Sequence, residues 1–258
     1  MKNKNSFRLL FGLLVFILGL AVSLTFNIFV LWANLEGMSF WGYPEALAFD
    51  SSLTAEARLS SVRCPVILAP GESGTVSVTV RNPNDYPIEA WISAHISMLG
   101  MQENMLRELR SAPLAPGEKT TLRWEVSEQN KNNSGMILAR IFLRLTERHP
   151  PSRTRHCGIA TIDLWGLSSG LITSAALVGG HILQAAGIWV WGQVKRQSTK
   201  EDNFTRNVMI AMSIFSLLMT LGSLSHSWVI SMVSLLVSLL LVFTAFGYGI
   251  GKSDHSIF

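Results

Sequence analysis

Histidine is the residue type in this chain best suited to chemistry inside a membrane. The sequence has six histidines, and His181 stands within an uncharged stretch, residues 164–194. An ionisable residue at that depth is a functional candidate by default. A haem held by two histidines needs a second one at similar depth, whereas His226 lies about 15 Å away along the membrane normal, judged by helix rise. Two interpretations of His181 remain: a single axial ligand to a haem or pigment, or a neutral histidine hydrogen-bonded to a neighbouring helix, which we expect.

The other residues that could do chemistry lack the familiar metal and redox motifs. The sequence has no His-Glu-x-x-His and no paired-cysteine motif, which mark zinc hydrolases and metal or redox sites. The long apolar stretches also hold no carboxylates of the kind found in proton-coupled pumps. We therefore expect no enzymatic activity, no catalytic residue, no metal site and no cofactor, with His181 as the weak cofactor candidate.

The two cysteines, Cys64 and Cys157, both fall in the polar middle of the chain. If that region lies outside the cytoplasm, its oxidising environment favours a disulfide between them. Closing a loop of about 90 residues would stabilise the fold by about 4 kcal/mol on the chain-entropy estimate. The alternative is a pair of free, buried thiols.

Four apolar stretches are long enough to position such residues in a membrane. A helix needs about 20 mostly apolar residues to cross the hydrocarbon, and residues 9–35, 164–194, 208–224 and 228–248 meet or nearly meet this requirement. Only 15% of all residues are charged, against roughly a quarter in soluble domains. We predict four transmembrane helices, arranged as a cytoplasmic tip with helix one (1–35), helix two (164–194), a basic loop (195–207), a hairpin of helices three and four (208–250) and a tail (251–258).

Positive charges beside these stretches predict their orientation. Cytoplasmic flanks are rich in Lys and Arg, and basic residues precede the first stretch and fill the loop between the second and third, whereas residues 36–57 have none. Both termini are therefore expected in the cytoplasm of a bacterial inner or plasma membrane. The first stretch could instead be a cleaved signal peptide, but it is longer than the roughly 7 to 15 apolar residues of such a signal, so we expect a retained helix.

The central residues, 56–163, have the pattern of an extracytoplasmic all-β sandwich. Short alternating runs separated by turn residues indicate half-buried strands. We expect Trp91 in the core and almost no linker between the last strand and helix two. The seven predicted strands are 57–63, 74–81, 88–98, 105–110, 119–126, 136–145 and 155–162.

A repeated phrase marks two of the turns. Leu-Ala-Pro-Gly-Glu occurs at residues 68–72 and again at 114–118, each time before an alternating run. With the turn at residues 82–88, this pattern resembles the immunoglobulin-like β-sandwich modules of bacterial surface proteins. The resemblance implies a fold and no site, because such modules serve many functions. A Cys64–Cys157 bridge would depart from the immunoglobulin pattern, in which the second and sixth strands are linked.

Small and hydroxylic residues recur at helical spacing in the three later stretches. Such faces let membrane helices approach closely and hydrogen-bond to one another. Asn27 and Gln184 add polar contacts of the same kind. Packing within the bundle and association with another protein both remain open. The helix-packing candidates are Ser169, Thr173, Gly180, Ser216, Thr220, Ser234 and Ser238.

Residues 36–55 are too short to cross a membrane and too aromatic for a free linker. We expect this segment either to lie along the membrane interface or to pack on a neighbouring subunit. The candidate contact residues are Phe40, Trp41, Tyr43 and Phe49.

Three functions are compatible with this organisation. The leading hypothesis is a non-catalytic accessory or scaffolding subunit of a membrane complex, which contacts other membrane subunits and the bilayer but no nucleic acid. The alternative is a surface ligand-binding or adhesion protein. The third is a cofactor- or pigment-binding subunit that uses His181.

Overall fold

The computed structural model describes residues 2–41, 58–98, 105–144, 153–194 and 200–253. The chain forms two compact units, one made of Met1–Leu31 with Gly170–Phe258 and the other of Trp32–Ser169. The first unit is helical and the second contains the β-strands. The first helix contributes residues to both units.

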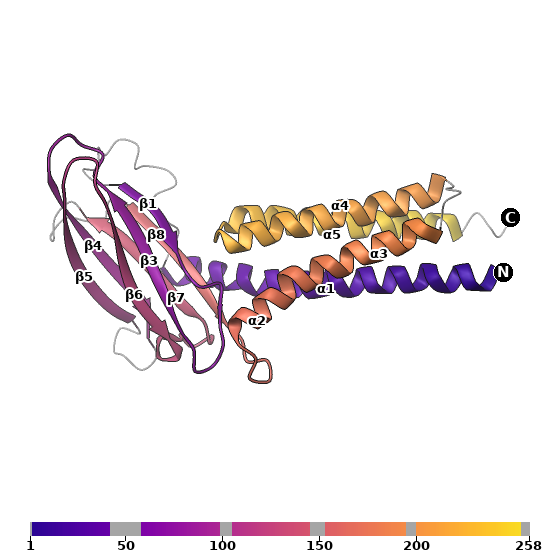
Figure 1. The fold of residues 1–258 in the computed structure, drawn as a ribbon, viewed down its shortest axis with the longest axis horizontal. Coiled ribbons are helices and arrows are strands. Elements are labelled where there is room, and N and C mark those ends of the chain that lie inside the picture. The colour runs from indigo at the N-terminus through magenta and orange to yellow at the C-terminus, as the bar shows by residue number, and fades with distance from the viewer. Residues whose placement is uncertain (1, 42–57, 99–104, 145–152, 195–199, 254–258) are drawn as a thin grey trace. The chain divides into compact units, whose positions relative to one another are not determined.

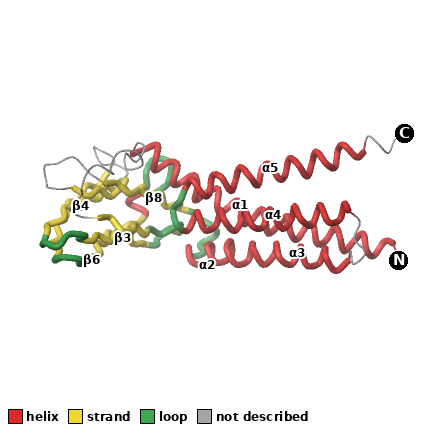
Figure 2. Tube along the Cα trace, turned by 90° about the horizontal axis from the view of Figure 1, so that it is seen from above, coloured by secondary structure: helices red, strands yellow, loops and turns green. Residues whose placement is uncertain are grey.

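Among the described residues, four helical segments are long and apolar enough to cross a membrane, and they are formed by five helices (Figures 1 and 2). The helices are α1 (Lys2–Trp41), α2 (Ser169–Ser174), α3 (Gly180–Val194), α4 (Lys200–Leu224) and α5 (Trp228–Ser253). A π-helical turn, Ala175–Gly179, joins α2 to α3, so these two helices form one candidate span, Ser169–Gln193. The other candidate spans are Phe7–Trp41, Phe204–Leu224 and Trp228–Ala245. Their length and composition support a membrane location, because each is long enough to cross the hydrocarbon.

Three of the helices extend beyond the apolar stretches that predict them. Helix α1 continues to Trp41, α4 begins at Lys200 and α5 continues to Ser253. The hydropathy pattern locates the part of a helix that suits lipid, whereas backbone hydrogen bonds continue the helix into polar sequence. Residues 36–41, which the sequence assigns to an interfacial segment, are therefore the last turns of α1. The rest of that segment, residues 42–55, lies outside the described residues.

The second unit is a sandwich of two sheets. One sheet has the order β1-β3-β6 and the other the order β2-β8-β7-β4-β5. All paired neighbours are antiparallel except β2 and β8, which are parallel. This two-sheet architecture agrees with the immunoglobulin-like resemblance at the level of fold. The strands are β1 (Arg58–Arg63), β2 (Ile67–Leu68), β3 (Ser73–Arg81), β4 (Ile88–Ser97), β5 (Met105–Leu114), β6 (Lys119–Ser127), β7 (Ile137–Arg144) and β8 (Arg153–Thr161).

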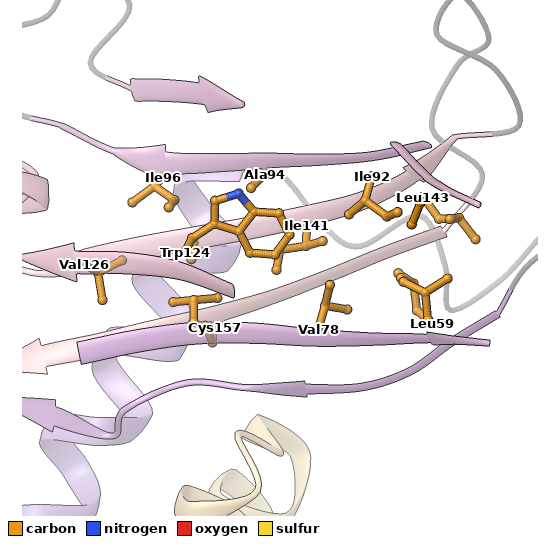
Figure 3. Packing of buried hydrophobic residues seen from close by; sticks show 14 of the residues in the cluster. Leu59, Val78, Ile92, Ala94, Ile96, Trp124, Val126, Ile141, Leu143 and Cys157 are labelled. Carbon is orange, nitrogen blue, oxygen red and sulfur yellow. The ribbon is translucent and has the colours of Figure 1, made fainter. Parts of the chain in front are cut away.

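The hydrophobic core lies between these two sheets (Figure 3). Valines of β3 alternate inward, and Trp124 of β6 is only 3% exposed. In Figure 3 the ring of Trp124 lies among Ala94, Ile96 and Ile141. The prediction that Trp91 belongs to this core is wrong, because the inward residues of β4 are its neighbours Ala90 and Ile92, and Trp91 on the opposite face is only partly buried.

The connection from the sandwich to α2 also differs from the prediction. Strand β8 ends at Thr161 and α2 begins at Ser169, so residues 162–168 form a linker. Within it the Leu167 N–H donates to the Leu164 carbonyl at 3.0 Å, which closes a turn. Trp165 and Gly166 have positive φ angles of 52° and 71°, a conformation incompatible with a continuous strand or helix. The chain therefore reverses locally before it enters α2.

The two Leu-Ala-Pro-Gly-Glu phrases form the same turn. Gly71 and Gly117 have φ angles of 77° and 73°, which glycine tolerates because it has no Cβ. The Ala69 and Ala115 amides donate to the Oε2 atoms of Glu72 and Glu118 at 3.0 and 2.7 Å. Each glutamate thus closes its own turn before the strand that follows.

Candidate functional site

The end of α1 packs against β8 in the sandwich unit. Gly158 lies so close to the backbone of Ala33 and Asn34 that an added Cβ would overlap the Ala33 carbonyl. The Gly158 N–H donates a hydrogen bond to Asn34 Oδ1 at 3.2 Å. Asn34 is buried, with 3% of its surface exposed. A glycine and a buried amide therefore attach the last turns of α1 to the sheet, and we call this contact the helix-sheet lock.

Aromatic and polar contacts extend the helix-sheet lock toward Trp41. The Trp41 ring lies 6.0 Å from His95 of β4, which packs edge-on against Phe142 of β7 at 4.7 Å. The guanidinium of Arg140 lies 4.4 Å above the Phe142 ring and donates to the Trp41 carbonyl. Ser134 donates to Glu36 Oε1 at 2.8 Å. The outer face of the β8-β7-β4 sheet is therefore covered by the end of its own helix.

The four predicted contact residues of the segment 36–55 have different outcomes in the structure. Trp41 packs on the sandwich, and its indole N–H is buried. Phe40 packs edge-on against Trp41 at 4.6 Å and keeps 40% of its surface exposed. Tyr43 and Phe49 lie outside the described residues. Phe40 is therefore the residue of this set that the structure shows exposed at the end of the helix.

The predicted disulfide is present directly beside the helix-sheet lock. Cys64, just after β1, is bonded to Cys157 of β8, with 6.6 Å between their Cα atoms. Cys157 precedes Gly158 in the strand that α1 contacts. The bond links the two sheets, because β1 and β8 belong to different ones.

Glu72 connects the β2–β3 turn to the first residue of α2. Its carboxylate accepts hydrogen bonds from the Ser169 N–H at 3.1 and 3.3 Å, in addition to the Ala69 bond. The hydrogen bonds from Ser169 and Ala69 hold the pKa of Glu72 below its usual value, since they stabilise the charged form. Ser169, one of the predicted helix-packing residues, is the first residue of α2 and bonds to this glutamate.

In the helical unit, polar side chains from three helices meet in one network. Gln184 of α3 donates to Ser23 Oγ at 3.1 Å and to Ser216 Oγ at 3.3 Å. Asn27 of α1 donates to Thr220 Oγ1 of α4 at 2.9 Å. All five side chains are at most 4% exposed. These contacts form the bundle packing that the small and hydroxylic residues predict, and we call the set the intramembrane polar network.

His181 lies at the border of this network. Its Nε2 is 3.3 Å from Thr220 Oγ1, and that hydroxyl gives its own proton to the Ser216 carbonyl at 3.0 Å. Thr220 can therefore only accept from His181, which makes Nε2 the protonated nitrogen. A ligand on this histidine would have to bind Nδ1. The arrangement agrees with the expected interhelical hydrogen bond and does not test a cofactor.

Two acceptors of the network lack a hydrogen-bond partner in the structure, Asn27 Oδ1 and Gln184 Oε1. Neither amide can be turned around, because Asn27 Nδ2 also donates to the Ser23 carbonyl and Gln184 Nε2 to the Gly19 carbonyl. Carbonyl oxygens only accept, so both amide nitrogens must stay where they are. Buried acceptors without a partner cost free energy, so these two oxygens reduce the stability that the network contributes.

Glycines bring α1 and α3 into close contact. Of these glycines, only Gly180 is among the predicted helix-packing residues. An added Cβ on Gly19 would lie 2.6 Å from the Gly180 carbonyl, and one on Gly187 would lie 2.7 Å from the Gly12 carbonyl. Small residues seven apart on both helices give the signal that could have revealed the contact. In the α4–α5 hairpin, Gly222 lies against Ser231 in the same way.

The remaining helix-packing candidates are distributed over the bundle. Ser234 and Ser238 of α5 are 4% and 3% exposed, and Ser238 donates to the Ser234 carbonyl at 2.8 Å. Gly180 is buried against Ser23, whereas Thr173 is only partly buried. Most of these residues therefore face other helices of the same unit.

One match to a catalytic motif can be tested against the structure. Residues 166–170 read Gly-Leu-Ser-Ser-Gly, which fits the Gly-x-Ser-x-Gly pattern of hydrolases. That motif requires a turn between a strand of an α/β sheet and a helix, whereas Ser168 follows a sandwich strand and precedes a candidate membrane span. The match therefore lacks its structural context. Within the described ranges, no three His, Cys, Asp or Glu residues are grouped as a metal site would require.

Comparisons with known proteins give only distant structural similarity. No family model matches the chain, and no curated protein matches it. The CARDB domain of the PF1109 protein from Pyrococcus furiosus, solved in complex with di-metal ions, is 12% identical with a TM-score of 0.33, over 44% of this chain and 97% of that one. A β-glucosidase from Listeria innocua is 21% identical with a TM-score of 0.27, over 42% of this chain but 16% of the enzyme. Similarity this low establishes no function. The description of the β-sandwich therefore rests on its own strand order.

Proposed function

We propose that this protein is a non-catalytic accessory or scaffolding subunit of a membrane complex, with its β-sandwich on the extracytoplasmic side and both termini in the cytoplasm. The orientation is supported by the basic residues that flank the spans. A bacterial inner or plasma membrane is the setting that fits this organisation.

The helix-sheet lock is the observation that carries the proposal. A flexible linker would let the sandwich search a volume around its point of attachment. Here the last turns of the first membrane helix are built into the sheet through Gly158, Asn34 and Trp41. Such a lock suits a domain that has to be held in a set position, as a scaffolding subunit requires.

Phe40 is the proposed contact point for a partner subunit. It extends the aromatic cluster of Trp41 and His95 and remains 40% exposed. Aromatic side chains are enriched at the centres of protein interfaces. An apolar residue at the exposed end of this cluster gives a partner a rigidly supported surface.

The test is purification from native membranes at native expression, in a mild detergent, followed by mass spectrometry. We expect defined membrane proteins to co-purify in stoichiometric amounts, and Phe40→Ala to reduce their recovery. Tyr86→Ala is the matched control, because Tyr86 is an exposed aromatic residue of the same unit, at 49%. A homogeneous monomer with no co-purifying protein would overturn the proposal.

A further inference from the structure

The linker between β8 and α2 presents an apolar surface to its surroundings. Trp165 is 90% exposed, the largest fraction among the large apolar side chains that the structure describes. Leu164 and Leu167 on either side are 38% and 37% exposed. These three residues belong to one closed turn, whose ends are joined by the bond from Leu167 N–H to the Leu164 carbonyl. We call this turn the tryptophan turn.

The backbone of the tryptophan turn holds the indole outward. Positive φ at both central residues, 52° at Trp165 and 71° at Gly166, is the signature of a type I′ turn. Asn, Asp or Gly normally occupies the first of these positions, and a bulky side chain rarely adopts it. A strained conformation that exposes the largest apolar side chain to water does not stabilise the fold. The same conformation becomes favourable if the exposed side chain enters an apolar environment outside the protein.

The connectivity of the chain places Trp165 close to one apolar environment, the lipid bilayer. The candidate span begins at Ser169, four residues after Trp165, and four extended residues reach at most about 14 Å. Wherever α2 enters the bilayer, Trp165 is therefore within reach of the same leaflet surface. Tryptophan is also the side chain that best suits the headgroup level, since its ring is apolar and its N–H can hydrogen-bond.

The base of the turn is connected to the sandwich. Glu72 accepts the Ser169 N–H just after the turn, and the same carboxylate closes the β2–β3 turn through Ala69. The residues that flank the tryptophan turn are therefore held by the sheet, so the turn is a supported element of this unit.

We propose that the tryptophan turn is a lipid anchor, in which Trp165, supported by Leu164 and Leu167, inserts into the headgroup region of the extracytoplasmic leaflet. The anchor does not depend on the scaffolding function, because it uses a different surface and a different partner. It gives the sandwich unit a membrane contact separate from α1.

The test is a depth measurement on the full chain in nanodiscs of phosphatidylcholine and phosphatidylglycerol. Because the two native cysteines form a disulfide, Trp165→Cys provides a single free thiol for an environment-sensitive fluorophore. Tyr86→Cys, at another exposed apolar position of the same unit, is the control. Unchanged thermal unfolding of both labelled proteins establishes that they fold.

We expect about a twofold loss of emission at position 165 when the lipids are brominated near the headgroup, because the turn holds this position there and an aromatic label takes the level of the tryptophan that it replaces. The label should also be protected from aqueous iodide. The label at position 86 should show the opposite behaviour. Quenching of position 165 by iodide to the same extent as position 86 would overturn the anchor. Protection from both quenchers would overturn it as well, because the turn would then be covered by protein.

Discussion

The backbone N–H of Gly158 donates a hydrogen bond to the side chain of Asn34, and the two residues are 124 positions apart in the sequence. The bond joins the extension of a membrane helix to the last strand of a β-sandwich. Glycine is needed at position 158 because the Ala33 carbonyl occupies the space of a Cβ. This contact makes the last turns of α1 a structural part of the domain.

Gly158→Ala should separate α1 from the sheet. The new methyl group would overlap the Ala33 backbone, which cannot move as a flexible side chain does. We expect a loss of about 1–3 kcal/mol in the free energy of unfolding, as for other overpacked sites, measured by denaturation in detergent. Gly170→Ala is the control, because an added Cβ there meets no atom within 4 Å. Equal stability of the two variants would contradict the close contact.

Asn82→Ala should destabilise the sandwich more than most single substitutions. Asn82 is fully buried, and its Nδ2 donates to the carbonyls of Tyr86, Leu114 and Ala115 at 2.8, 3.1 and 3.1 Å. Alanine would remove all three bonds, although the Ala115 carbonyl keeps the Glu118 N–H as a donor. We expect a loss of about 3 kcal/mol in the free energy of unfolding.

Asn84→Ala is the matched control for this substitution. The Asn84 backbone N–H donates to Asn82 Oδ1, and alanine keeps that bond. Chemical denaturation followed by tryptophan fluorescence should rank the two variants clearly. A smaller effect for Asn82→Ala than for Asn84→Ala would show that the three carbonyls have other partners.

Glu72→Gln should change how stability depends on pH. The pKa of Glu72 is lowered on folding by its bonds with Ser169 and Ala69, so the charged form stabilises the fold at a pH above the ordinary glutamate pKa of 4.5. That contribution is lost as the pH falls through the lowered pKa. We expect the melting temperature of Glu72→Gln to lie below wild type at pH 7 and to approach it under acidic conditions.

Glu118→Gln is the internal control, because Glu118 closes the equivalent turn at the second Leu-Ala-Pro-Gly-Glu phrase through the Ala115 N–H. Its effect at pH 7 should be smaller than that of Glu72→Gln. If the two substitutions lower the melting temperature equally at pH 7, the Glu72–Ser169 contact adds nothing to the turn itself.

Gly187→Ala should weaken the contact between α1 and α3. The added Cβ would lie 2.6 Å from the Phe16 Cβ and 2.7 Å from the Gly12 carbonyl. Membrane helices depend on such close approach, because lipid offers no hydrophobic driving force for association. We expect a loss of about 1–3 kcal/mol by analogy with other overpacked contacts.

Gly192→Ala is the control, because Gly192 is on the same helix and an added Cβ there meets no atom within 4 Å. It should leave stability unchanged or raise it slightly, since alanine is the better helix former. Thermal unfolding of both variants in the same detergent decides the point. Comparable melting temperatures would argue against the α1–α3 packing described above.

The pattern of the sequence predicts the secondary structure well and the role of individual side chains less well. All seven expected strands are present, because alternation and turn residues are local signals. Strand β2 is missed because its two residues, Ile67 and Leu68, are too few to show a period.

The error at Trp91 has a different cause. Strand β4 is buried on both faces at Ile92, Ser93 and Ala94, since one face meets the core and the other is covered within the same unit. Alternation then cannot distinguish the core face, which depends on the contact with α1. Periodicity likewise does not reveal the pairing of Asn34 with Gly158, because it joins a helix to a strand 124 positions away in the sequence.

Hydrogen exchange of β8 in the intact protein tests the helix-sheet lock most directly. In lipid nanodiscs, Asn34→Ala should raise the exchange of the Gly158 amide at least about tenfold, because a lost structural hydrogen bond exposes its donor to opening. Strand β3, which has no contact with α1 among those described, should exchange as in wild type. Unchanged protection of Gly158 in Asn34→Ala would contradict the lock and, with it, the observation that carries the proposed scaffolding function.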